Sequence, residues 1–138
     1  MRCKTAIKPL IWVPRYWPAI GGAELHSRRL AHELSGAGEV GVLTHCDDGN
    51  VLLALGASQS IAKKNSDTGT IVHRTGLQGC SREILRCLAH WHARWRVSRP
   101  FYAFAFRQFM AAQVSNIVQN YDLVHCVYNG LTESAELG

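Results

Sequence analysis

The chain has 138 residues, which is enough for one domain with a hydrophobic core. An apolar fraction of 47% with 18% charged residues is ordinary for a globular protein and argues against intrinsic disorder. The net charge of +5 is concentrated in residues 82–107, which hold six arginines and one acid. This points to a local anionic partner or a local solvated face, and not to a protein that coats nucleic acid.

No run of the sequence approaches the roughly 20 apolar residues that a membrane-spanning helix needs. The basic start of the chain is followed by an apolar run that Lys8 and Pro9 interrupt, so we expect no signal peptide. The five cysteines are odd in number, scattered, and without a Cys-x-x-Cys pair. Free thiols in a reducing compartment are the simplest interpretation, and they favour a cytoplasmic protein.

A strand and a glycine loop are predicted at the start of the chain. Residues 6–13 end in a compact apolar run without helical spacing, which predicts a buried strand that Pro14 closes. Residues 14–23 are rich in proline and glycine and predict a loop.

The helix that follows is predicted to be amphipathic. Small and apolar side chains recur at helical spacing over residues 23–34, and Glu24 is expected on the opposite, solvent-facing side, where it forms an i,i+4 pair with Arg28. Gly36 ends the helix, and residues 39–44 predict a second strand. A crossover of this length joins parallel strands.

Alternating helices and strands continue in the second half. The further elements in chain order are an ambiguous segment at residues 51–64, a strand at 70–74, a helix that Ser81 caps and Pro100 breaks, a helix at about 101–120 with Phe106, Met110 and Val114 on one face, and a strand at 122–128. Residues 131–138 resemble the first turns of another helix. The alternation predicts an α/β fold with a Rossmann-like doubly wound parallel sheet, in one domain.

The loop that carries Gly21 and Gly22 is the strongest candidate for a binding site. In a doubly wound sheet, ligands bind beyond the carboxyl ends of the strands, and this loop leaves the first strand there. Adjacent glycines let a ligand approach the backbone, and the free N–H groups of the next helix suit a phosphate. A tight turn without a ligand is the alternative. The pattern is not Gly-x-Gly-x-x-Gly, so a nicotinamide dinucleotide is not expected.

Several stretches in the same order resemble one family. The segment RYWPAIGGAELHSRRLAHELSGAGEVGVLT, residues 15–44, is similar to the opening of retaining glycosyltransferases of family 4, which have the two-domain GT-B fold. The shared pattern is an aromatic-Pro loop, Gly-Gly-x-Glu, a helix with Leu-Ala-x-x-Leu and a strand ending Val-x-Val-x-Thr. Residues 72–74 and 121–125 resemble the family's third strand and its Asp-x-x-His strand. Two positions depart from the pattern: Gly38 replaces a histidine, and Val127 replaces the second histidine of His-x-His.

The resemblance implies that residues 1–138 are the truncated N-terminal, acceptor-side domain of a GT-B enzyme whose C-terminal donor-binding domain is absent. Such an enzyme moves a sugar from a nucleotide-diphosphate sugar to the hydroxyl of a saccharide or lipid-linked acceptor. The catalytic residues are expected in the missing domain, so the fragment alone is expected to be inactive, and no metal or other cofactor is expected. Gly21 and Gly22 would contact the diphosphate. His125 would face the sugar, although a strand histidine bonded to its neighbours fits equally well.

The basic segment offers a second kind of contact. Arg86, Arg94 and Arg96 lie among tryptophans, a composition typical of helices on anionic membrane surfaces, which would make the protein peripheral on the inner face of the membrane. The alternative is a stripe of Ile84, Leu88, Trp91 and Trp95 that faces the core, with a solvated basic back. A non-catalytic phosphate-binding module and a peripheral membrane protein are therefore the rival functions.

Two groups of potential ligands are interpreted as structural. Cys87 and His90 share a helix face, but no second ligand pair follows at zinc-finger spacing, so no metal site is expected. Residues 45–48, with a histidine, a cysteine and two aspartates, follow a strand as a turn does.

Overall fold

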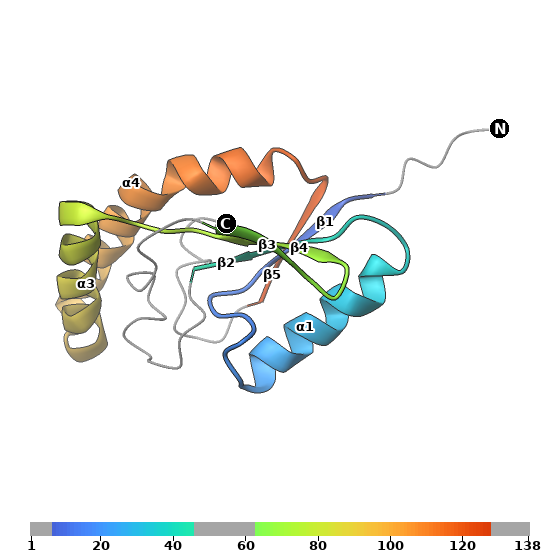
Figure 1. The fold of residues 1–138 in the computed structure, drawn as a ribbon. Helices are drawn as coiled ribbons and strands as arrows, with labels where there is room; N and C mark the ends of the chain where they lie inside the picture. The colour runs from blue at the N-terminus through green and yellow to red at the C-terminus, as the bar shows by residue number, and fades with distance from the viewer. Residues whose placement is uncertain (1–6, 46–62, 128–138) are drawn as a thin grey trace.

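The computed structural model describes residues 7–45 and 63–127. They form a five-stranded sheet with helices on both faces, and Figure 1 shows α4 above the sheet and α1 below it. The elements in chain order are β1 (Pro9–Trp12), α1 (Gly22–Ser35), β2 (Gly41–Thr44), β3 (Lys63–Asp67), β4 (Thr70–Arg74), α3 (Gly79–Arg94), the 3-10 turn η1 (Arg96–Ser98), α4 (Arg99–Val118) and β5 (Leu123–Cys126). The predicted α/β class is confirmed, but the sheet is mixed and mostly parallel where a parallel sheet was predicted, because β3 pairs antiparallel with β4.

The sheet has the strand order β3-β4-β2-β1-β5. Strands β4, β2, β1 and β5 are parallel, so their carboxyl ends lie at one edge, which we call the carboxyl edge. In β1, Ile11 pairs with Val42 of β2 on one side and with His125 of β5 on the other. The strand that feeds the glycine loop is therefore an inner strand of the sheet.

Alternate side chains of β1 enter two separate cores. Leu10 and Trp12 pack with residues of α3 and α4, whereas Ile11 and Val13 pack with Ala31 of α1. All four β1-region side chains are at most 2% exposed. Burial on both faces explains why this segment reads as a continuous apolar run without alternation.

Strand β3 was not predicted from the sequence. Its residues pair antiparallel with β4, and a two-residue turn at Thr68 and Gly69 joins the two strands. Both turn residues have positive φ, 48° and 83°, as the tight hairpin turns that match strand twist require. Lys63 and Lys64 thus belong to a strand, whereas residues 46–62 and 128–138, including the expected turn after His45 and the last expected helix, lie outside the described residues.

The boundaries of α3 also differ from the prediction. The helix begins at Gly79 after Gln78 and not at a Ser81 cap, and it ends at Arg94. Pro100 lies in the first turn of α4, where its missing N–H costs no helix bond, so the helix break lies upstream at Trp95.

The apolar stripe of α3 does not face the core. Leu85 and Ala89 are fully buried, whereas the side chains of Ile84, Trp91 and Trp95 are 48%, 62% and 66% exposed. The alternative of a core-facing stripe is therefore wrong for Ile84, Trp91 and Trp95, whereas Leu88 packs against the core. In α4 the predicted face is confirmed, because Phe106, Met110 and Val114 are buried.

Candidate functional site

The glycine loop connects the carboxyl end of β1 to the first turn of α1. Gly21 is the residue before the helix, in an extended conformation, and no side chain bonds to cap this helix start. The first bond of the helix runs from the Leu25 N–H to the Gly21 carbonyl oxygen. The N–H groups that precede Leu25 therefore lie at a positively polarised helix start beside the carboxyl edge, which is the geometry of an anion site.

The two glycines of the loop have different roles. A β-carbon at Gly21 would collide with the Glu24 carboxylate, so the chain's own packing requires glycine there. A β-carbon at Gly22 would meet no atom within 4 Å, and Gly22 is exposed. The open approach to the backbone is thus at Gly22, whereas Gly21 is closed by the protein itself.

Glu24 is buried and not solvent-facing, so the expected pair with Arg28 is wrong. Its side chain is 4% exposed and accepts a bond of 2.7 Å from Nε of Arg15 in the preceding loop. A carboxylate in the first turn of a helix is favoured by the helix dipole, and the arginine offsets the cost of burying its charge. The pair fixes the loop to α1 and leaves the inner side of the helix start electrically balanced.

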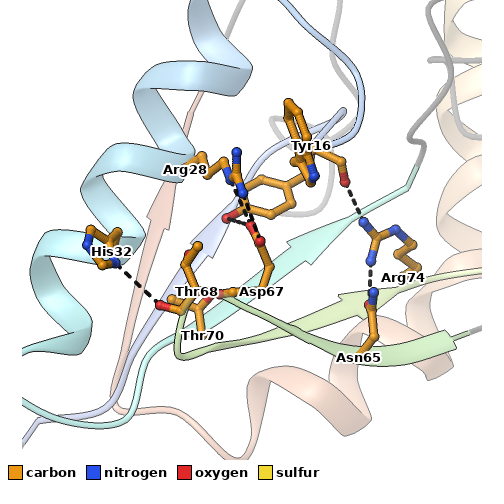
Figure 2. Close-up of polar contacts among 9 residues, drawn as sticks. Tyr16, Arg28, His32, Asn65, Asp67, Thr68, Thr70 and Arg74 are labelled. Carbon is orange, nitrogen blue, oxygen red and sulfur yellow. Dashed lines mark hydrogen bonds and ion pairs between the residues drawn. The ribbon is translucent and has the colours of Figure 1, made fainter.

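A second ion pair joins α1 to β3 and contacts the loop through Tyr16 and Trp17. Nε and Nη2 of Arg28 each lie 3.0 Å from a carboxylate oxygen of Asp67, the last residue of β3. Figure 2 shows this fork together with the buried Tyr16, whose hydroxyl donates to the same carboxylate over 3.3 Å. Burial, followed by the charge of Asp67, raises the pKa of Tyr16 to about 12. The guanidinium of Arg28 also lies 4.1 Å from the centroid of the Trp17 ring.

Strand β4 holds the loop through Arg74. Its guanidinium donates to the Trp17 carbonyl oxygen and to Oδ1 of Asn65. Figure 2 shows the contact between Arg74 and Asn65. The loop therefore contacts α1, β3 and β4 through charged or polar side chains that are distant in sequence. Such a loop is positioned by the fold before any ligand arrives.

His45 follows β2 at the carboxyl edge and is fully buried. The indole N–H of Trp12 donates to Nε2 over 2.8 Å, and because an indole nitrogen is only a donor, Nδ1 must carry the imidazole proton. Nδ1 lies 2.7 Å from the hydroxyl oxygen of Thr75, which accepts a hydrogen bond from the Nδ1–H group. Burial lowers the pKa of His45 to about 3. Both nitrogens are used internally, so His45 is a structural residue of the edge.

The other predicted contact, His125, lies on the strand next to β1. It is exposed and pairs with Ile11, which faces the α1 side of the sheet, so the histidine projects on the same side as the glycine loop. Its ring has no bonded partner among the described residues. The interpretation of a histidine bonded to its neighbours is therefore not supported within that part of the chain.

Described residues of α3, α4 and the sheet line pockets. One, of about 430 Å³, lies between α4 and β5 and is lined by Trp12, Ala111, Val114, Ser115, Val118, Val124 and Cys126. Another, of about 330 Å³, is lined by His90, Trp91, Arg94 and Trp95. Within residues 7–45 and 63–127, no three His, Cys, Asp or Glu side chains lie close enough to hold a metal, and no helix is long and apolar enough to cross a bilayer.

Comparisons with protein-family models, with curated proteins and with solved structures found no match for this chain.

Proposed function

We propose that this chain is the acceptor-side domain of a retaining, family 4-like glycosyltransferase with the GT-B fold. In this proposal the glycine loop contacts the diphosphate of a nucleotide sugar through the open backbone at Gly22, while Gly21, which was expected to share this contact, is covered by the Glu24 carboxylate. The sugar then moves to a hydroxyl of the acceptor. The single observation that carries the proposal is the open backbone at Gly22, at the start of α1 and at the carboxyl edge of an inner parallel strand.

The electrostatics of the loop support this assignment. Arg15 offsets the charge of Glu24, so the helix start keeps its positive polarity toward the open side at Gly22. Helix ends of this kind offset the charge of a leaving diphosphate without a metal, so we expect no metal or other cofactor. His125, exposed on the same side of the sheet, is the candidate contact to the sugar.

The proposal includes a second domain and a location. Most donor contacts and the catalytic residues would come from a C-terminal domain, so we expect residues 1–138 to be inactive alone. The described cysteines Cys80, Cys87 and Cys126 are exposed free thiols, which fits a reducing, cytoplasmic environment.

Amide chemical shifts test the proposal directly. UDP-glucose and GDP-mannose are titrated into the chain, with inorganic phosphate as the control, and the signals of Gly21, Gly22 and Ala23 are followed. We expect weak binding of the nucleotide sugars that shifts these amides. The Gly22→Ala variant keeps the fold, because its new β-carbon meets no atom, but it should lose the shifts.

Two results would contradict the proposal. If inorganic phosphate alone produced the same shifts and the nucleotide sugars bound no better, the loop would belong to a non-catalytic phosphate-binding module. If Gly22→Ala bound a nucleotide sugar as well as the parent chain, the diphosphate would not approach this backbone.

A further inference from the structure

The junction between α3 and α4 exposes large apolar side chains in close succession. Trp91 and Trp95 at the end of α3, Val97 in η1, and Phe101 and Phe104 in the first turns of α4 are between 62% and 77% exposed. We call these five residues, together with Arg94, Arg96 and Arg99, the aromatic corner. Clusters of exposed large apolar residues on a folded domain mark an interaction surface.

The charges of the aromatic corner are of one sign. No residue between Glu83 and Asp122 is acidic. Arg94, Arg96 and Arg99 are exposed and have no ion-pair partner among the described residues. A surface that combines indole rings with unpaired guanidinium groups is complementary to the interface of a bilayer with anionic headgroups.

Arg86 differs from the arginines of the corner. Its guanidinium lies 3.5 Å from the Glu83 carboxylate, which also pairs with Arg82 at 3.2 Å. The expectation that Arg86, Arg94 and Arg96 act together is thus refined, because only Arg94 and Arg96 lie beside the exposed aromatic rings.

The pocket of about 330 Å³ described above is part of the aromatic corner, because Trp91, Arg94 and Trp95 line it together with His90. Its walls are two indole rings with a guanidinium beside them. An anionic headgroup could place its phosphate at the arginine while its glycerol and upper chain contact the rings.

We propose that the aromatic corner docks on an anionic phospholipid surface, with the aromatic rings in the interface and Arg94, Arg96 and Arg99 at lipid phosphates. This inference does not rest on the proposed transferase function. It has a geometric consequence, because Phe106 of α4 packs on His45 at the carboxyl edge, with ring centroids 5.2 Å apart. In Figure 1, α3 and the first turns of α4 lie on the side toward which the parallel strands run. Docking would therefore bring the carboxyl edge near the bilayer.

Sedimentation with sucrose-loaded vesicles tests the proposal. We expect the chain to bind equimolar phosphatidylcholine/phosphatidylglycerol vesicles and not phosphatidylcholine alone, and to be released at about 0.5 M salt, where the Debye length is only roughly 4 Å. Each basic residue near an anionic bilayer strengthens binding roughly five-fold, so Arg94→Glu/Arg96→Glu should weaken it by ~25-fold or more.

A matched control distinguishes the effect of this surface on vesicle binding from the effect of the protein's net charge. Arg29 on α1 and Lys8 at the amino end of β1 are exposed and lie outside the corner, and Arg29→Glu/Lys8→Glu makes the same change in net charge. We expect this control to bind within about three-fold of the parent chain. Equal loss of binding in both double variants would overturn the proposal, as would parent-like binding of Arg94→Glu/Arg96→Glu.

The aromatic residues need their own test. Trp91→Ser/Trp95→Ser should lose vesicle binding with an unchanged circular dichroism spectrum, because both side chains are exposed. In the parent chain, brominated lipids should quench tryptophan fluorescence. In this variant, Trp12 and the half-buried Trp17 remain, and their fluorescence should not be quenched, because the variant should not bind the vesicles. The lipid proposal would fail if the parent chain did not bind vesicles but formed dimers in sedimentation velocity. If Trp91→Ser/Trp95→Ser abolished those dimers, the aromatic corner would bind a second copy of the chain.

Discussion

The glycine loop and the aromatic corner use the same residue types in opposite ways. Around the loop, Arg15 pairs with Glu24 and Arg28 pairs with Asp67, and the aromatic ring of Tyr16 is fully buried. At the corner, the described arginines lack acidic partners, and the aromatic rings face solvent. Both regions lie at or near the carboxyl edge.

The difference separates two uses of charge. Paired arginines around the loop hold a backbone conformation, so their replacement should cost stability. Arginines at the corner form no ion pair within the described structure, so their replacement should weaken binding to the proposed lipid surface and leave the stability of the fold almost unaltered. Measurements of stability alone therefore sort the residues of the two regions.

The largest expected effect is on the stability contributed by His45, a fully buried polar residue at the carboxyl edge. Its pKa is about 3 in the folded state and about 6.5 in the unfolded chain, so between these values the unfolded state binds more protons. Its contribution to stability is complete above about pH 6.5 and is lost as the pH falls toward 3. The loss is of the order of a few kcal/mol, at up to ~1.4 kcal/mol per pH unit. Urea unfolding from pH 7 to pH 4 measures this slope.

His45→Gln is the control for that slope, because glutamine offers a donor and an acceptor but does not titrate. The variant should be less stable at pH 7, yet its stability should fall less steeply with acid. Identical slopes in the parent and the variant would show that His45 is not held neutral by burial.

A smaller effect is expected at the Arg28–Asp67 pair. Asp67→Asn removes the charge that receives both guanidinium bonds and the Tyr16 hydroxyl, and we expect a loss of about 2 kcal/mol in the free energy of unfolding. A double-mutant cycle with Arg28→Gln should give a coupling of about 1 kcal/mol. Arg94→Gln/Arg96→Gln is the comparison from the corner and should stay within about 0.5 kcal/mol of the parent. Equal destabilisation by the two sets would remove the distinction between the regions.

The smallest effect is a difference in sign between adjacent glycines. Gly21→Ala places a β-carbon against the Glu24 carboxylate and should destabilise by about 1–2 kcal/mol. Gly22→Ala lies in open space at a helix start and should stabilise by about 0.5 kcal/mol through the unfolded state. Thermal unfolding of the two variants measures both signs. Destabilisation by Gly22→Ala would mean that the space is not open.

Much of the fold could be predicted from the sequence, because local patterns determine it. The apolar runs of β1 and β2 follow from burial on both sides of a parallel sheet. The buried face of α4 follows from the helical spacing of its apolar residues. Strand β3 could not be found this way, since KKNSD is polar and the strand lies at an edge where only hydrogen bonds to β4 define it.

The remaining errors in the prediction concern features that depend on contacts with residues distant in sequence. In α3, two overlapping stripes have helical spacing, and packing against α4 selected Leu85 and Ala89 in place of Ile84 and Trp91. The helical pattern places Glu24 on the solvent-facing side, because it does not reveal the ion pair with Arg15 of the preceding loop. For the candidate site, the sequence identified the loop and its glycines, but only coordinates distinguish the role of Gly21 from that of Gly22.

The antiparallel edge strand β3 limits where further strands can be added to the sheet. It pairs with β4 in the opposite sense to every other strand, and it presents Lys64 and other exposed polar residues at its margin. An edge of this kind discourages a further strand from joining. Enlargement of the sheet, whether by more of the same polypeptide or by a neighbour, would therefore proceed from the β5 side, where the exposed Leu123 offers apolar surface to a newcomer.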